Sequence, residues 1–401
     1  MKQKIVYILI LLACSLNTVA QKKEISQAKA NIKSGKNLEQ TEQSMRKILA
    51  DSTQRDNEKV WLLLFEAVKK QYEQGNEKLY LKQQYDTAQL FVLTRKMFEV
   101  LEGFDSLDAK PNSKGKSAPV YRKRHAEFLH QFRPNLYNGG IFFANKQKYQ
   151  DAYHLLDLYL DCARQPLFQQ YNYAETDNKL SEAAYWAVFC GYKLQNPKAT
   201  LHHVYQALKD TTHYCLMLQY LAETYKLEND TTRWVETLQE GFSRYPLFPF
   251  FFPRLISYYG EKGDWNKVET ISDEALKADS TKQTFLFAKS TALLNLSRLN
   301  ECVEVSERII KADSLFPDAY YNAGLAYYNR AEQLNKKLQQ SAKTKNEIKA
   351  NYKKAMPYLQ RYRALKPDDS SQWLMPLYNI YLNLNMGKEF DEVDRLMRTK
   401  K

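Results

Sequence analysis

The sequence predicts an all-α fold in which antiparallel helix hairpins stack into one solenoid. Two observations support this prediction. Apolar and small residues recur every 34 residues over the C-terminal two-thirds, and helix-breaking residues are scarce. The 401 residues include only 12 glycines and 12 prolines but 29 tyrosines. Few breakers and many bulky aromatics suit packed helices, whereas dinucleotide-binding folds need glycine at their phosphate turns.

The first twenty residues have the pattern of a secretory signal peptide. Two lysines precede an apolar run over 5–13, and Thr18-Val19-Ala20 offers a cleavage site. The run is too short to cross a bilayer as a helix. We therefore expect a periplasmic protein that begins after Ala20. The alternative is lipid anchoring at Cys14, with outer-membrane association, because Leu11-Leu12-Ala13-Cys14 resembles a lipobox.

Residues 21–133 are predicted to form an N-terminal helical region. Amphipathic helices pair across 24–104, where one helical face carries Trp61, Leu64, Phe65 and Val68. Residues 105–118 are rich in turn-forming residues, and we expect them to form a loop.

The clearest hairpin pattern lies in the remaining region, 134–401. In the stretch 319–328, an aromatic residue is followed by a small pair and then by another tyrosine: Tyr320, Ala323, Gly324 and Tyr327. Steps of 34 residues back from Gly324 lead to Ser290, Ile256, Ala222 and Val188. The second helix keeps the same phase, with small or apolar residues at Thr200, Trp234, Val268 and Cys302.

These spacings resemble the tetratricopeptide repeat (TPR), a hairpin of two helices. The resemblance implies a TPR-like right-handed superhelical solenoid, because each hairpin needs its neighbours to bury its apolar face. Before residue 134 the region 21–133 is only a degenerate version of the motif. A polar helical insertion near 331–350 is predicted to lengthen both helices of one hairpin into an arm, and 164–179 is an irregular linker.

The resemblance also implies that the first helix of each hairpin lines a concave groove. The groove positions carry mostly aromatic residues, together with Glu223 and Lys226; the aromatic ones are Tyr137, Tyr185, Phe189, Tyr192, Phe287, Tyr321, Tyr328 and Tyr378. Tyrosine offers a rigid contact surface with a polar tip, which suits a protein or peptide partner and also a glycan. The alternative is that several of these rings pack against neighbouring helices.

No motif for catalysis or for a cofactor is present. The sequence lacks H-E-x-x-H and G-x-S-x-G. Adjacent residues on a helix point about 100° apart, so His202 and His203, with His213 further on, are not expected to bind a metal. No carboxylate stands isolated in an apolar stretch that would raise its pKa. We therefore expect no enzyme, no metal and no cofactor.

Charge and cysteine usage complete the prediction. The net charge is +13, but the lysines are spread along predicted helices, so no nucleic-acid partner is expected. The four cysteines beyond Cys14 fall in helical patterns and are expected to be buried, with Cys162 and Cys190 the one pair worth testing for a disulfide. A recurring Asp-Ser/Thr tripeptide fits either a turn or an O-glycosylation acceptor.

The sequence thus predicts an exported scaffold that mediates protein–protein interaction in the bacterial cell envelope through an aromatic concave groove. The alternative is a glycan-binding accessory protein of an envelope uptake system.

Overall fold

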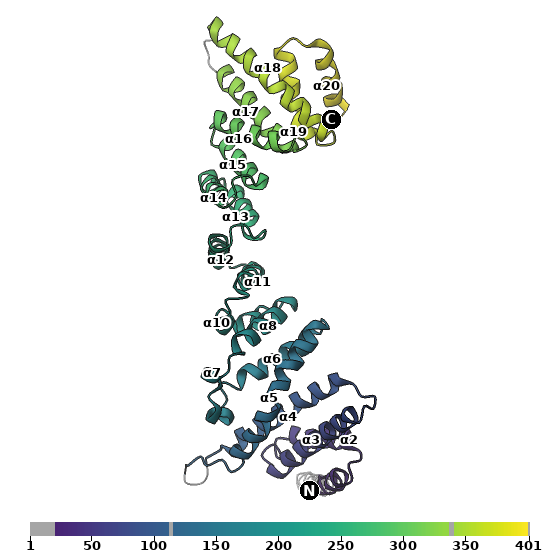
Figure 1. Ribbon diagram of the computed structural model, residues 1–401. Coiled ribbons are helices and arrows are strands. Elements are labelled where there is room, and N and C mark those ends of the chain that lie inside the picture. The colour runs from purple at the N-terminus through teal and green to yellow at the C-terminus, as the bar shows by residue number, and fades with distance from the viewer. Residues whose placement is uncertain (1–20, 112–114, 337–340, 400–401) are drawn as a thin grey trace, which may run out of the picture. The chain divides into compact units, whose positions relative to one another are not determined.

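The protein is described by a computed structural model that covers residues 21–111, 115–336 and 341–399. These residues form helices joined by turns, and the described ranges contain no strand (Figure 1). The expectation of an all-α, TPR-like array of antiparallel helix hairpins is confirmed. The predicted signal peptide and Cys14 lie outside the described residues. The chain divides into two compact units, 1–229 and 230–401, here called unit 1 and unit 2.

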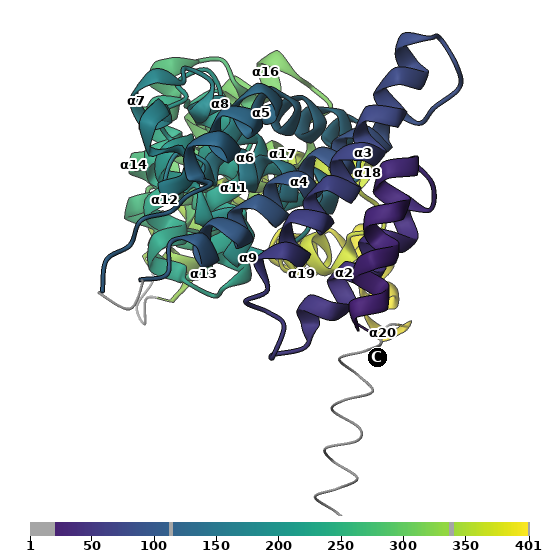
Figure 2. The same ribbon diagram turned by 90° about the horizontal axis from the view of Figure 1, so that it is seen from below.

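The first described helix of unit 1 covers residues 21–34. The helices that follow are α2 (Leu38–Ala50), α3 (Glu58–Tyr80), α4 (Thr87–Asp108), α5 (Arg122–Asn145), α6 (Tyr149–Asp161), the 3-10 helix η1 (Pro166–Tyr171), α7 (Tyr173–Thr176), α8 (Leu180–Lys193), α9 (Pro197–His202), α10 (Val204–Ala207) and α11 (Tyr214–Leu227). Helices α2, α3 and α4 pack side by side (Figure 2). The expected loop over 105–118 begins later, because α4 continues to Asp108, and the expected boundary at residue 134 falls inside α5.

Unit 2 contains the more regular hairpins. Its helices are α12 (Thr231–Arg244), α13 (Phe251–Glu261), α14 (Trp265–Ala278), α15 (Gln283–Asn295), α16 (Leu299–Ala312), α17 (Pro317–Asn335), α18 (Ala342–Leu365), α19 (Ser370–Asn383) and α20 (Gly387–Thr399). Helices α14 and α16 begin 34 residues apart, as do α15 and α17. The insertion near 331–350 falls in α17 and α18, which are 19 and 24 residues long.

The 34-residue period is also present in the backbone of the hairpin turns. A left-handed residue recurs at Gln195, Asn229, Gly263 and Ser297, with φ between 51° and 70°. At most of these turns the next residue caps the second helix: the Asn196, Asp230 and Asp264 side chains each accept a hydrogen bond from a backbone N–H three residues on. Such a cap stabilises a helix by about 1 kcal/mol. The turn therefore fixes where each second helix begins.

The recurring Asp-Ser/Thr tripeptide has a structural role at the junctions between hairpins. The carboxylates of Asp51, Asp210, Asp279 and Asp313 each accept the backbone N–H two residues on, at 2.8–2.9 Å. These are Asx turns, which reverse the chain after a second helix. Asp105 differs, because it lies within α4 and pairs with Arg122 on α5 at 2.8 Å.

The cysteines of the described residues are free, and Cys162 and Cys190 form no disulfide. Both are buried, as is Cys302, but Cys215 is only half-buried, so the expectation of burial is wrong for that residue. Burial raises the pKa of the Cys190 and Cys302 thiols to about 12. These cysteines therefore act as small core residues.

The irregular linker after α6 is held to the α5–α6 hairpin by Arg133. Its guanidinium carbon lies 3.8 Å from the ring centroids of both Tyr159 and Tyr173, and Nη1 is 2.7 Å from Asp177 Oδ2. Nη2 also donates to the Tyr159 carbonyl oxygen at 3.0 Å. The arginine is almost completely buried, so its charge depends on these partners.

We predict that Arg133→Met destabilises the protein by about 3–5 kcal/mol, because it leaves the Asp177 carboxylate buried without its cation. The free energy of unfolding in urea measures this. The double variant Arg133→Met/Asp177→Asn is expected to regain part of the loss, since it removes the unpaired charge. A single variant as stable as the wild type would contradict the assigned role.

Candidate binding cleft

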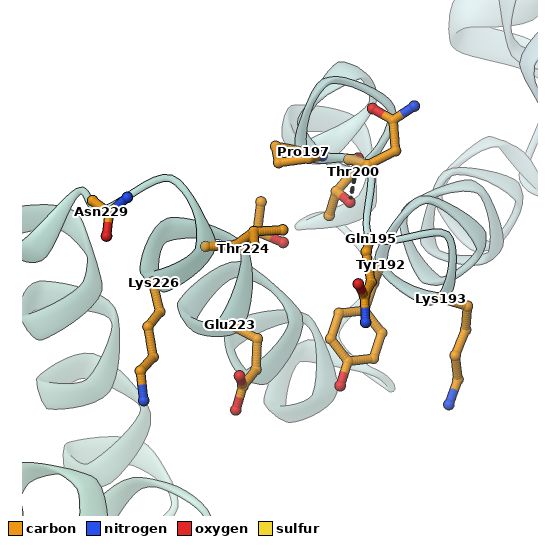
Figure 3. Close-up of a pocket in the computed structure, with 11 residues that line it drawn as sticks. Tyr192, Lys193, Gln195, Pro197, Thr200, Glu223, Thr224, Lys226 and Asn229 are labelled. Carbon is orange, nitrogen blue, oxygen red and sulfur yellow. Dashed lines mark hydrogen bonds between the residues drawn. The ribbon is translucent and has the colours of Figure 1, made fainter.

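An open cleft of about 650 Å³ lies in unit 1 between the end of α8, the start of α9 and the second half of α11. Its walls carry polar and charged side chains, which are drawn in Figure 3. In that view Tyr192, Lys193, Glu223 and Lys226 extend toward the same side of the cleft, from α8 and α11. Gln195, Asn196, Pro197, Thr200, Thr224, Leu227 and Asn229 complete the lining.

Close helix packing and the hairpin turn fix the wall formed by α8 and α9. A Cβ atom at Gly191 would lie 2.5 Å from the backbone nitrogen of Thr200, so only glycine allows this approach. The N–H of Asn196 donates to the Gly191 carbonyl oxygen at 3.1 Å, and the Thr200 hydroxyl donates to the Asn196 carbonyl oxygen at 2.9 Å. The wall is therefore held by backbone contacts, which do not depend on a ligand.

A series of stacked rings joins α8 to α11 beside the cleft. The ring centroid of Tyr192 lies 4.6 Å from that of Tyr220, and Phe189 lies 5.8 Å from the same ring. Tyr185 stacks on His213 at 4.0 Å with 14° between the planes. Because 185, 189 and 192 share one helical face, three of the predicted groove residues pack against the next hairpin.

Two of the predicted groove residues are not available as contact surface. Tyr137 is 8% exposed and Tyr185 is 5% exposed. The Tyr137 ring packs 5.6 Å from that of Tyr159, with Lys179 Nζ 4.5 Å from its centroid, because the linker after α6 covers it. Tyr185 is covered by His213, which precedes α11. These two positions belong to the core.

Tyr192, Glu223 and Lys226 do lie together, as lining residues of the cleft. In unit 2 the four remaining positions are half-buried. Their rings contact neighbouring helices through Phe287–Phe316 at 5.7 Å, Tyr321–Tyr362 at 4.9 Å, Tyr328–Tyr352 at 6.1 Å and Tyr378–Phe390 at 4.8 Å. The Tyr328 hydroxyl also accepts a hydrogen bond from Asn379 Nδ2 at 2.7 Å.

The structure brings His202 and His203 together on one carboxylate, contrary to the sequence expectation. Nε2 of His203 lies 2.6 Å from Asp157 Oδ1, and Nδ1 of His202 lies 3.4 Å from the same oxygen. The expectation assumed one regular helix, but α9 ends at His202 and the backbone of His203 leaves helical geometry at φ −110°, ψ 14°. His213 lies elsewhere, bonded to Asp210.

The sequence expectation that no carboxyl group would have a raised pKa is wrong for Glu102. It lies within the largely apolar stretch Val100-Leu101-Glu102-Gly103-Phe104 on α4. Burial, reinforced by the nearby charges of Asp161, Glu99 and Asp105, raises its pKa to about 8. Its Oε1 atom has no hydrogen-bond partner among the described residues. The apolar residues on either side of Glu102 in the sequence were the signal that could have predicted this raised pKa.

We predict that Glu102→Gln removes a pH dependence of stability. Because folding raises the pKa of Glu102, the protonated carboxyl group contributes to the stability of the folded state. This contribution is complete below about pH 4.5, the unperturbed pKa, and is lost as the pH rises through about 8. The thermal midpoint of the wild type should therefore fall between pH 6 and pH 9 more steeply than that of Glu102→Gln. Equal slopes would contradict the prediction, and Glu127→Gln, which removes an exposed carboxylate on α5, is the matched control.

The repeated geometry of the hairpins identifies the fold class. The described helices form successive hairpins that begin at 34-residue intervals and turn through a repeated left-handed residue. The chain is a TPR-like helical-repeat protein. No family model matches it, and no curated protein matches it.

Solved TPR structures resemble the chain at low sequence identity. The C-terminal part of a TPR repeat-containing protein from Cytophaga hutchinsonii is 9% identical, with a TM-score of 0.42, and covers 64% of this TPR-like chain and 92% of its own. A TPR repeats protein from Bacteroides fragilis is 17% identical, with a TM-score of 0.29, and the match covers 66% of this chain and 98% of that protein's chain. The TPR2AB domain of yeast Sti1, in complex with pHSP90, is 16% identical, with a TM-score of 0.26, and the match covers 77% of this chain and 95% of that domain's chain. At these scores the similarity carries no functional assignment.

Proposed function

We propose that this protein is a binding scaffold, not an enzyme, and that the cleft between α8, α9 and α11 receives an extended peptide segment of a partner protein. The observation that carries the proposal is the cleft itself. It is open, its α8–α9 wall is fixed by backbone contacts, and it is lined by hydrogen-bonding and charged groups. Stacked helical hairpins commonly use such concave surfaces to bind other proteins.

The chemistry of the lining suits a polypeptide. Gln195 and Asn229 have side-chain amides, which can both donate to a peptide carbonyl and accept from a peptide N–H. Lys193 and Lys226 are exposed cations and Glu223 is an anion on the same side (Figure 3). We infer that the bound segment carries at least one carboxylate facing the lysines, together with unpaired backbone groups.

The arrangement of the rings favours a peptide over a glycan. Sugar rings bind proteins through open aromatic faces, but the Tyr192 ring packs on Tyr220 and has Lys193 Nζ 5.8 Å from its centroid. The hydroxyl of Tyr192 remains directed along the cleft wall beside Glu223 (Figure 3). This places hydrogen bonding, rather than ring stacking, at the centre of recognition.

The location of this activity is proposed from the sequence. The lysines, apolar run and small residues over 1–20 support export to the periplasm, and Cys14 offers lipid anchoring as the alternative. Within the described residues, no helix combines the length and the apolar character that crossing a membrane would need. The proposed partner is therefore a protein of the cell envelope.

The test uses the double variant Tyr192→Phe/Lys193→Glu, which removes a hydroxyl and reverses a charge while keeping the ring that stacks on Tyr220. We expect wild-type protein to cross-link a partner from envelope fractions, and a peptide of that partner to bind the variant at least about tenfold more weakly, a loss of about 1.4 kcal/mol. Isothermal titration calorimetry with the peptide measures the affinity.

The matched control is Tyr205→Phe/Lys209→Glu. It makes the same chemical changes at another lysine–tyrosine pair in unit 1, where Lys209 Nζ lies 4.9 Å from the Tyr205 ring and both residues are exposed. We expect this control to bind the peptide like the wild type. Equal binding by both double variants would place the partner outside the cleft and overturn the proposal.

A further inference from the structure

Four side chains that could ligate a metal ion converge between α6 and the end of α9. Asp157 and Asp161 are four residues apart and therefore share one face of α6. His202 ends α9, and His203 follows it at the break before α10. One candidate ligand atom from each residue lies within 4.8 Å of all the others. The whole cluster belongs to unit 1.

We propose that Asp157, Asp161, His202 and His203 form a binding site for one divalent cation of the zinc class. Two imidazole nitrogens and two carboxylate oxygens are ligands that Zn²⁺ accepts in four-coordinate sites. The imidazoles disfavour Mg²⁺ and Ca²⁺, which prefer oxygen ligands alone. None of these four residues lines the peptide cleft, so the two sites are distinct.

The spacing of the ligand atoms fits an ion after small side-chain movements. A tetrahedral Zn²⁺ site with bonds of about 2.1 Å separates its ligand atoms by about 3.4 Å. The His202–Asp157 pair at 3.4 Å already matches this value, whereas the His203–Asp157 pair at 2.6 Å would have to lengthen to admit an ion. The side chain of His202 is 45% exposed and can rotate, which brings the widest pairs inward. The ion would replace the proton between His203 Nε2 and Asp157.

The surroundings also leave the site open to a cation. Asp161 accepts no hydrogen bond from a side chain within the described ranges, although it lies beside a second carboxylate on the same helical face. Like charges at this spacing repel each other on a helix, and a dication would remove that repulsion. Arg164 Nη2 lies 3.4 Å from His203 Nδ1, but Arg164 is exposed, so its side chain can swing into solvent. The Tyr153 hydroxyl lies 3.4 Å from His202 Nδ1, and rotation of the exposed His202 ring would release this contact.

The ion would join two successive hairpins. Asp157 and Asp161 belong to the hairpin of α5 and α6, whereas His202 and His203 belong to the hairpin of α8 and α9. A ligand that binds only the folded state raises the unfolding temperature. Zn²⁺ should therefore act as a clamp that stabilises unit 1.

The test measures binding of Zn²⁺ to untagged full-length protein that has been treated with a chelator and dialysed. We expect saturable binding of one ion per chain by calorimetry and a raised thermal midpoint, with no midpoint shift from Mg²⁺. His202→Gln and Asp161→Asn each remove one ligand at positions that are not buried, and we expect each to weaken Zn²⁺ affinity at least about tenfold. Circular dichroism checks that both variants remain folded.

The control His213→Gln changes a histidine outside the cluster, paired with Asp210, and is expected to bind Zn²⁺ like the wild type. Absence of saturable binding to wild-type protein would overturn the proposal, and so would equal binding by all three variants. In either case the cluster would be a polar contact of the core. Because peptide binding is measured separately, failure here leaves the proposed function untouched.

Discussion

A hairpin of two helices cannot bury its own apolar face, and this constraint shapes the whole protein. Each hairpin must be covered by the next one, through side chains on its first helix. In unit 1 that contact consists of aromatic rings, with Phe189 and Tyr192 packed on Tyr220. In unit 2 Phe287 on α15 makes a similar contact, 5.7 Å from the ring of Phe316, which directly precedes α17. The high tyrosine content of the chain is therefore largely explained by packing between helices.

The same contact determines where a ligand can bind. Rings that hold α8 against α11 cannot also present both faces to a partner. A partner would therefore contact the edges of these rings and the polar groups beside them. The cleft lies at this place, next to the hairpin turn at Gln195. Helix α9 contributes Thr200 to the cleft wall and His202 to the cluster on Asp157. A cation held there would fix α9 against α6 and so make the cleft wall more rigid.

Much of the fold follows from local patterns in the sequence. The 34-residue spacing identified the hairpins because each second helix starts at a turn with a left-handed residue and, in most cases, an Asn or Asp cap, as at Asn196 and Asp264. The predicted insertion falls in α17 and α18, which are long and polar at their adjoining ends. These features depend on residues close together in the chain.

The candidate sites depend on contacts that a repeat pattern does not contain. Tyr137 is buried because the irregular linker folds back over it, and Tyr185 because His213 stacks on it. The two adjacent histidines converge because the helix breaks between them and α10, which ideal helix geometry does not predict. Glu102 shows that a carboxyl group can be buried by neighbouring helices without any motif. In each case contacts with other helices or with the linker determined the environment of the residue, and rules based on neighbouring positions in the sequence did not predict it.

The central claim is that a partner peptide binds in the cleft of unit 1. The most direct measurement is hydrogen–deuterium exchange of the full chain with and without the cross-linked partner's peptide. We predict that added peptide slows exchange of backbone amides over 192–200 and 223–229, at both walls of the cleft. Protection confined to other segments, such as α17 and α18, with unchanged exchange at both walls, would contradict the account.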